Sequence, residues 1–288
     1  MADVIIIGAG PAGVSAALYT IRGGLETTVI TSGDSALEKA KKIENYYGFP
    51  EPISGKELLS RGIDGAERLG VKFVHKQAVS VEYDDGGFSA VTSDDEKYKG
   101  KAVLFATGSR RLAPPIRGIA EFEGKGVSYC AVCDAFFYRN KDVGVLGSGE
   151  YALHEAKVLA RTSKSVTVFT NGEEPQADFP SGFKIVKTPV SEFGGDAKIE
   201  RAVLNDNSEI KIDGLFIAYG VASSAALAKK IGAVTSGSKI KIDDNMMTNV
   251  KGIFAAGDCT GGLLQVSKAV GDGAVAGTEI IKYVRKEK

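Results

Sequence analysis

Val4-Ile5-Ile6-Ile7-Gly8-Ala9-Gly10-Pro11-Ala12-Gly13 is the stretch that decides the fold. Its β-branched run predicts a buried strand, and the Ala- and Leu-rich segment that follows, to Arg22, predicts a helix. Gly8, Gly10 and Gly13 allow a tight turn, close approach of the backbone to a pyrophosphate, and close packing of helix on strand. A second predicted strand, 27–31, is followed by Asp34, which is placed to bind ribose hydroxyls. The stretch therefore predicts a dinucleotide-binding βαβ unit.

The same pattern returns later in the chain. A strand at 143–146 leads into Gly147-x-Gly149-x-x-Ala152, then a helix, then a strand at 166–170, and Glu173 stands where Asp34 stands in the first unit. Alternating segments between the units, such as 79–83, predict an antiparallel insertion. We expect an α/β protein with two Rossmann-like three-layer domains, the second inserted into the first. The expected bounds are 1–112 with 243–288 for the first domain and 113–242 for the inserted one.

Composition excludes several classes of protein. The chain has 288 residues, with 36 basic and 36 acidic ones, so no net field attracts nucleic acid or an anionic membrane. Glycine is abundant, at 36 residues. The uncharged stretch 4–21 is interrupted by Gly and Pro and follows Asp3, so we expect neither a membrane span nor a signal peptide. With only three cysteines, we expect a cytoplasmic protein.

The second chemical signal is Cys130-Ala-Val-Cys133, followed by Asp134. A zinc site would need further ligands, and the chain offers only Cys259 and two separate histidines, so we assign no metal. A structural cysteine pair remains an alternative. In the redox interpretation, the sulfurs lie one turn apart near a helix start, which favours a thiolate. Asp134 is placed to exchange the proton that a leaving thiolate requires.

Taken together, these motifs resemble the low-molecular-weight thioredoxin reductases. The segment Cys-Ala-Val-Cys-Asp-Ala-Phe-Phe-Tyr-Arg-Asn (130–140), between the two glycine turns and before Ile253-Phe-Ala-Ala-Gly-Asp258, carries the resemblance over essentially the whole chain. It implies bound FAD in the first domain, a disulfide that the flavin reduces, thioredoxin as acceptor, and a homodimer. It further implies that Cys133 faces the flavin, that Cys130 attacks thioredoxin, and that Asp134 is the acid.

The resemblance also implies a set of FAD contacts, which includes the glycines of the first turn. The set is Gly8, Gly10, Ala12, Gly13, Asn45, Thr107, Gly108, Gly257, Asp258, Gln265 and Val266, to which the first turn's own pattern adds Asp34.

The sequence departs from the family at the second nucleotide unit. NADPH-dependent members carry several arginines there for the 2′-phosphate, whereas this chain has Phe-Thr-Asn-Gly-Glu-Glu at 169–174. One alternative is an enzyme that uses NADH, either a disulfide reductase or an oxidase, with an acid bound to the ribose. The other, which we favour, resembles the ferredoxin-dependent flavin thioredoxin reductases and takes electrons from reduced ferredoxin. Docking of an acidic ferredoxin would need lysines such as Lys39, Lys41 and Lys42, or the basic residues at 282–286.

Overall fold

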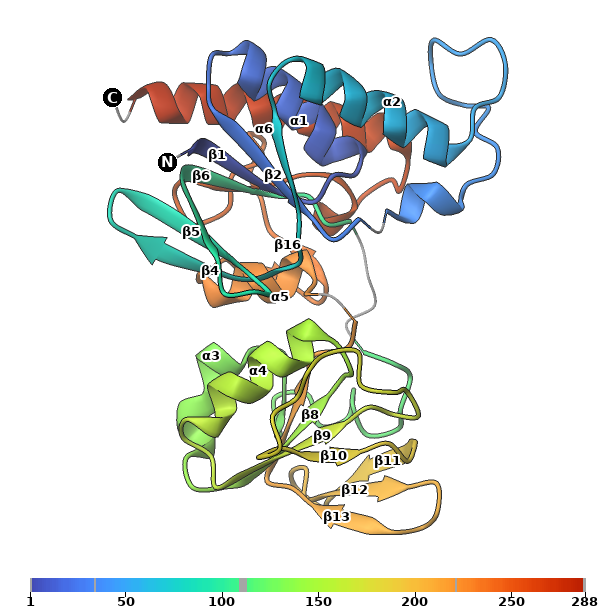
Figure 1. Ribbon diagram of the computed structural model, residues 1–288, viewed down its shortest axis with the longest axis vertical. Helices are drawn as coiled ribbons and strands as arrows, with labels where there is room; N and C mark the ends of the chain where they lie inside the picture. Colours follow the sequence, from blue (N-terminus) through green and yellow to red (C-terminus); the bar gives the residue numbers. More distant parts are fainter. Residues whose placement is uncertain (1, 34, 109–112, 221, 287–288) are drawn as a thin grey trace. The chain divides into compact units, whose positions relative to one another are not determined.

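The computed structural model describes residues 2–33, 35–108, 113–220 and 222–286, and the chain divides into two compact units (Figure 1). The first unit comprises Met1–Arg110 and Ser223–Lys288, and the second comprises Arg111–Ala222. Each unit is built on its own predominantly parallel sheet and is described separately. The α/β class and the insertion of one Rossmann-like unit into another are as the sequence predicts.

The first unit is built on a seven-stranded sheet in the order β3-β2-β1-β6-β5-β4, with β17 also paired to β6. Strands β1, β2, β3, β6 and β17 are parallel, and β4 and β5 extend the sheet as an antiparallel hairpin. The strands are β1 (Ala2–Ile7), β2 (Thr27–Thr31), β3 (Lys72–His75), β4 (Ala78–Asp84), β5 (Gly87–Thr92), β6 (Lys97–Phe105), β15 (Thr235–Ser236), β16 (Lys239–Ile240) and β17 (Ile253–Ala255).

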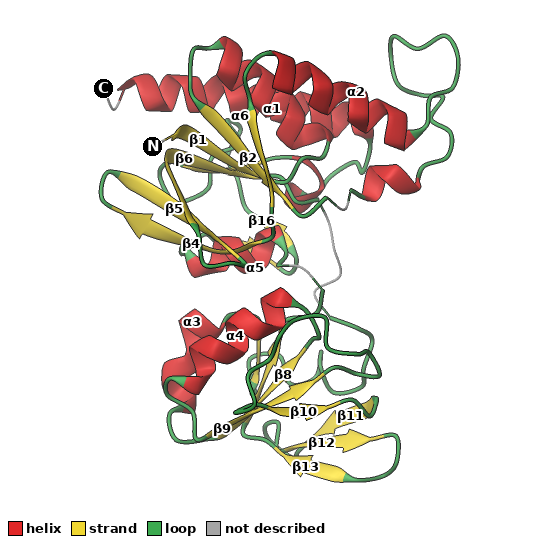
Figure 2. Ribbon diagram, in the orientation of Figure 1, coloured by secondary structure: helices red, strands yellow, loops and turns green. Residues whose placement is uncertain are grey.

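Helices α1 (Pro11–Arg22), α2 (Gly55–Arg68) and α6 (Val266–Lys286) lie together on one face of this sheet (Figure 2). Two glycines of α6 allow α1 to approach closely, because a Cβ on Gly273 would lie 2.2 Å from the Ala12 carbonyl oxygen and one on Gly277 would lie 2.9 Å from that of Ala16. The unit also contains η1 (Ala36–Lys39), α5 (Ser224–Lys230) and η3 (Gly257–Thr260). The helices pack on the sheet around an apolar core that includes Ala9 and Ala12 of the glycine turn.

The second unit has a five-stranded parallel sheet in the order β10-β9-β8-β14-β7, and a separate three-stranded antiparallel sheet, β11-β12-β13. Its elements are β7 (Val127–Ser128), α3 (Ala131–Asp134), η2 (Ala135–Tyr138), β8 (Asp142–Leu146), α4 (Glu150–Ala160), β9 (Ser165–Phe169), β10 (Lys184–Val186), β11 (Val190–Gly194), β12 (Arg201–Leu204), β13 (Glu209–Lys211) and β14 (Gly214–Ile217). Phe169, Phe193 and Leu215 belong to its apolar core.

The second boundary between the units differs from the sequence-based expectation. The sequence assigned residues 223–242 to the inserted domain, whereas in the structure they group with the first unit. Ser223 caps α5 through its side chain, and α5 buries its alanines. The ammonium group at its end, on Lys230, donates to the carbonyl of Val79 in β4 at 2.9 Å. The contact between Lys230 and Val79 spans 151 residues of sequence, so it could not be read from the local pattern that placed the boundary at 243.

None of the helices within the described ranges is long and apolar enough to cross a membrane. Within the same ranges, no three His, Cys, Asp or Glu side chains are grouped as a metal-binding set.

Candidate active site

The first glycine turn joins β1 to α1 and can be built only from glycine at two positions. Gly8 has φ +109°, and a Cβ there would lie 2.5 Å from the Ala106 carbonyl oxygen. A Cβ on Gly13 would lie 1.9 Å from the carbonyl oxygen of Gly8. Gly10, in contrast, is the helix N-cap with φ −71°, and a Cβ there would face open space, with no atom of the described residues beyond its chain neighbours within 4 Å. The turn is therefore closed toward the sheet and open at Gly10, where a phosphate can approach the amides of α1.

Other expected cofactor contacts lie at the carboxyl ends of the parallel strands. Thr107 follows β6, and its hydroxyl bonds to the hydroxyl of Ser224 at 2.6 Å. Asn45 donates to Gln265 at 3.0 Å, across 220 residues of sequence. Gly108 follows Thr107 with φ +72°, Gly257 and Asp258 form the turn after β17, and Val266 begins α6. Asp34 lies outside the described residues.

The turn after β17 borders the first glycine turn directly. Gly257 has φ +82°, and a Cβ there would lie 2.9 Å from the Cβ of Ala12. Two glycine turns thus meet at the carboxyl ends of β1 and β17, which both pair in parallel with β6. Dinucleotides bind at the carboxyl ends of the strands in doubly wound sheets. The open position at Gly10, at the start of α1, fits the pyrophosphate of a dinucleotide such as FAD. Ser224, which holds Thr107, was not predicted, because its contact depends on α5 joining this unit.

In the second unit, Cys130 and Cys133 form a disulfide at the start of α3. Cys130 is the N-cap of α3, and its sulfur accepts the Cys133 amide at 3.2 Å. In the disulfide, Cys130 is buried, with 3% of its surface exposed, whereas Cys133 is exposed. The paired state agrees with the redox interpretation of the motif.

Two side chains that the sequence did not single out support this disulfide. The Ser128 hydroxyl donates to the Asp134 carboxylate at 2.6 Å and accepts the Cys130 amide at 3.1 Å. The Glu155 carboxylate, buried on α4, accepts the amide of Ala131 at 2.7 Å. Ser128 therefore links the first cysteine to the acid, and Glu155 anchors the first turn of α3. A serine two residues before a CxxC motif is a signal that sequence reasoning can use, whereas Glu155 is brought there only by folding.

Comparison with known proteins places this geometry in a family. The profile of the family described as "Pyridine nucleotide-disulphide oxidoreductase" matches residues 2–273. A thioredoxin reductase of Listeria monocytogenes is 36% identical, covering 99% of this chain and 95% of its own. One from Aquifex aeolicus is 35% identical, covering 89% and 84%. The chain belongs to the thioredoxin reductase family. The FAD expected from the sequence is the cofactor of this family.

Two solved structures of the family are particularly similar. The atypical thioredoxin reductase TRi from Desulfovibrio vulgaris Hildenborough is 38% identical, with a TM-score of 0.94 and 99% of both chains covered. A ferredoxin-flavin thioredoxin reductase from Clostridium acetobutylicum is 31% identical, with a TM-score of 0.75, and 99% of this chain and 98% of that chain are covered.

In the present chain, side chains of the second unit form hydrogen bonds around the second glycine turn. The Ser148 hydroxyl donates to one oxygen of Glu173, and the Tyr219 hydroxyl donates to the other at 2.8 Å. This carboxylate raises the pKa of Tyr219 because it accepts a hydrogen bond from the protonated phenol. The amide of Gln176 donates to the Ser148 carbonyl at 2.7 Å. Glu150 is the first residue of α4, where a pyrophosphate would meet the helix.

Tyr151 is the second residue of α4, directly after the second glycine turn. Its side chain is buried in the unit, and its hydroxyl donates toward the Tyr129 carbonyl at 3.4 Å. Burial, together with the nearby Glu155 carboxylate, raises its pKa well above the ordinary value. The ring therefore packs within the unit.

Cys259 is separate from the redox pair. It lies in η3 of the first unit, and its thiol donates to the carbonyls of Phe105 at 3.4 Å and Ala256 at 3.3 Å. Burial raises its pKa to about 11. The buried thiol therefore packs within the turn.

Proposed function

We propose that this flavoprotein passes electrons from reduced ferredoxin, through FAD and the Cys130–Cys133 disulfide, to thioredoxin. The observation that carries the proposal is the disulfide itself, placed at an exposed, mostly apolar surface and linked through Ser128 to a carboxylate. This arrangement supports thiol–disulfide exchange with a protein partner.

The proposed reaction reduces the Cys130–Cys133 disulfide and then transfers its two electrons to thioredoxin. FAD held by the first unit would supply the two electrons. With two protons, reduction of the disulfide breaks its S–S bond and leaves Cys130 and Cys133 as thiols. The Cys130 thiolate then attacks the thioredoxin disulfide, so that one thioredoxin sulfur leaves as a thiolate and a mixed disulfide forms. Cys133 attacks the Cys130 sulfur, which releases reduced thioredoxin and restores the disulfide. Asp134 takes the proton of the attacking cysteine and returns it to the leaving sulfur.

The proposed partner surface lies around α3 and η2. Val132 is 53% exposed, Phe136 71% and Phe137 67%. The guanidinium of Arg139 lies 5.5 Å from the Phe136 ring centre, a cation–π contact that orders an exposed ring. Exposed aromatic residues with an arginine are typical of protein contacts. Because Cys130 is buried in the disulfide, its attack on thioredoxin requires that it become accessible after reduction.

The second glycine turn supports a donor other than a nicotinamide nucleotide. Glu150 puts a negative charge at the start of α4, where it repels a pyrophosphate. The acid that would hold the ribose of NADH, Glu173, already accepts the hydroxyls of Ser148 and Tyr219. Similarity to the ferredoxin-flavin thioredoxin reductase supports a ferredoxin instead. The family resemblance also leads us to propose a homodimer.

Anaerobic mixing tests the donor. The oxidised flavoprotein is mixed in turn with NADPH, NADH and reduced ferredoxin, while the flavin absorbance is followed. Reduced ferredoxin should bleach the flavin rapidly, whereas both nicotinamides should leave it oxidised over many minutes. Rapid bleaching by NADH would support the NADH-dependent alternative and overturn the ferredoxin proposal.

Trapping tests the acceptor and the roles of the two cysteines. In Cys133→Ser, a mixed disulfide between Cys130 and thioredoxin cannot be resolved by the second sulfur of this chain. A stable covalent complex should therefore accumulate with a thioredoxin whose own resolving cysteine is replaced by serine and whose attacked cysteine carries a small thiol as leaving group. The matched variant Cys130→Ser should accumulate little. A complex formed mainly by Cys130→Ser would reverse the assigned roles, and a complex in neither variant would argue against thioredoxin as acceptor.

A further inference from the structure

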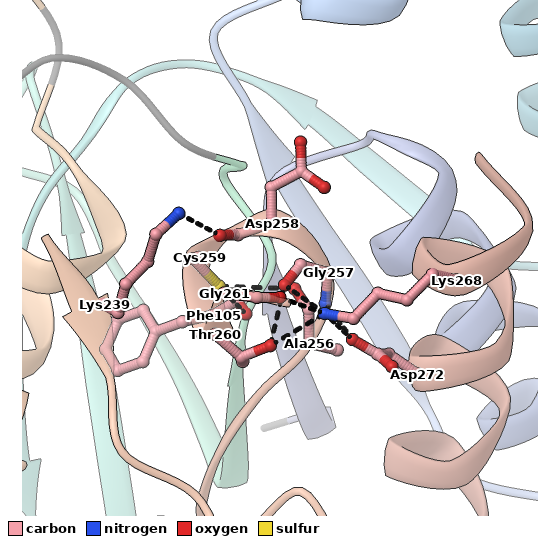
Figure 3. A network of polar contacts seen from close by, with 10 residues as sticks. All are labelled: Phe105, Lys239, Ala256, Gly257, Asp258, Cys259, Thr260, Gly261, Lys268 and Asp272. Atoms are coloured by element: carbon pink, nitrogen blue, oxygen red, sulfur yellow. Dashed lines mark hydrogen bonds and ion pairs between the residues drawn. The ribbon is translucent and has the colours of Figure 1, made fainter. Parts of the chain in front are cut away.

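A lysine on α6 is surrounded by acceptors from the turn after β17 (Figure 3). The Lys268 ammonium lies 2.6 Å from the Asp272 carboxylate, 2.8 Å from the Gly261 carbonyl oxygen, 3.0 Å from the Thr260 hydroxyl and 3.1 Å from the Gly257 carbonyl oxygen. Only 22% of the lysine side chain and 11% of the aspartate side chain are exposed. Through three of these acceptors, one ammonium group binds residues 257, 260 and 261 of the turn.

The position of this lysine is electrostatically costly for the helix. Lys268 lies in the first turn of α6, where the helix dipole disfavours a positive charge. Asp272, one turn further along, offsets that cost. The lysine of the Lys282–Glu279 pair on the same helix is 59% exposed, whereas Lys268 is 22% exposed. The stability of α6 therefore does not explain a lysine at this position, and its contacts with the turn after β17 suggest another role.

The same network also fixes the peptide groups around Asp258. Asp272 accepts the Gly257 amide at 3.0 Å, and the ammonium of Lys239 donates to the Asp258 carbonyl at 2.7 Å. In a trans peptide, the N–H points opposite to the preceding C=O. Because lysines hold the carbonyls of Gly257 and Asp258, the amides of residues 258 and 259 are turned away from those lysines. The Asp258 carboxylate also points away from the network in Figure 3.

We propose that Lys268, neutralised by Asp272, is a flavin-positioning residue. It holds the carbonyl side of the turn at 257–261, so that the opposite side presents donors to the cofactor beside the first glycine turn, which Gly257 contacts through Ala12. Lys268 acts on the flavin indirectly, by fixing the carbonyl groups of this turn. The inference rests on the proposed assignment of Gly257 and Asp258 as flavin contacts.

The test compares Lys268→Met with the matched control Lys282→Met, which removes a lysine from the exposed ion pair of the same helix. The readouts are the FAD dissociation constant of the stripped protein, the visible spectrum of the holoenzyme, and the unfolding temperature of the stripped protein. Because Lys268→Met leaves the Asp272 charge unpaired, Lys268→Met/Asp272→Asn is included. It removes both charges and keeps an oxygen for the Gly257 amide.

We expect Lys268→Met and the double variant to bind FAD at least about tenfold more weakly and to shift the flavin spectrum, because the freed carbonyls let the turn rotate. Lys282→Met should match wild type.

If Asp258→Ala loses FAD while the double variant binds it as wild type does, the role of Lys268 is wrong and the flavin assignment stands. If Asp258→Ala also binds FAD normally, the flavin assignment is wrong. A lower unfolding temperature with unchanged FAD affinity and spectrum would show a purely structural role and overturn the proposal.

Discussion

Ser128 is the side chain through which the first cysteine and the acid are connected. Its hydroxyl contacts both the Asp134 carboxylate and the Cys130 amide. We predict that Ser128→Ala slows thioredoxin reduction about tenfold, because a displaced acid loses part of the rate gain of proton transfer. The FAD content should not change, since Ser128 lies in the other unit. The measurement is the rate of thioredoxin thiol formation with a chemical reductant as donor.

Ser128→Thr is the control, because it keeps the hydroxyl and adds a methyl group; it should restore most of the rate. Equal rates for wild type and Ser128→Ala would show that Asp134 needs no such support. The sequence predicted Cys130, Cys133 and Asp134 because they are adjacent along the chain. It missed Glu155 because a contact across 24 residues depends on how α3 and α4 pack.

Cys259 provides a prediction about pH. Its pKa is raised from 9.0 to about 11 by burial, so the folded state holds the thiol proton more tightly than the unfolded state does. The resulting stabilisation is complete below pH 9 and is lost as the pH rises toward 11. The difference in unfolding free energy between wild type and Cys259→Ala should therefore be constant below pH 9 and shrink above it. A difference that does not change up to pH 11 would contradict this account of Cys259.

At the scale of elements, the first glycine turn distinguishes a requirement for folding from one for binding. A Cβ on Gly13 would collide with the Gly8 carbonyl, whereas one on Gly10 would face open space. We predict that Gly13→Ala lowers both stability and FAD content, and that Gly10→Ala folds normally but binds FAD at least about tenfold more weakly, since its methyl group stands where the pyrophosphate approaches. Thermal unfolding and flavin titration measure the two effects. Normal FAD binding by Gly10→Ala would place the cofactor elsewhere.

Elements that are specified locally were the ones that the sequence predicted well. The strand, glycine turn and helix of both βαβ units depend on contiguous residues, and the structure has both. The boundary at residue 243 was wrongly placed because α5 is assigned by its long-range contacts, such as Lys230 to Val79. The sequence showed the acids after the second turn. It could not show that Glu173 binds the Tyr219 hydroxyl, because Tyr219 lies 46 residues away along the chain.

For the whole molecule, recognition of a ferredoxin should depend on local charge, because the net charge is zero. Lys282 pairs with Glu279, and Arg285 donates to the Gly23 carbonyl, so these basic groups are already engaged. Lys39 and Lys41 are exposed, and within the described residues neither is paired with an acid. We predict that Lys39→Glu/Lys41→Glu slows flavin reduction by ferredoxin about tenfold at low salt, and less at high salt.

The control for this prediction is Lys282→Glu, which should have a smaller effect on the same stopped-flow rate. An unchanged rate in the double variant, or a larger loss of rate in Lys282→Glu, would show that ferredoxin does not dock at residues 39–41.

The most direct test of the account is the electron balance of the complete system under anaerobic conditions. Reduced ferredoxin, the flavoprotein and oxidised thioredoxin are mixed, and oxidised ferredoxin and thioredoxin thiols are both counted. Because an iron–sulfur donor gives single electrons and a disulfide takes a pair, two ferredoxins should be oxidised for each thioredoxin disulfide opened. The yield should be lost in Cys130→Ser/Cys133→Ser. Equal thiol formation when NADPH or NADH replaces ferredoxin, or thiols formed by the variant without both cysteines, would contradict the account.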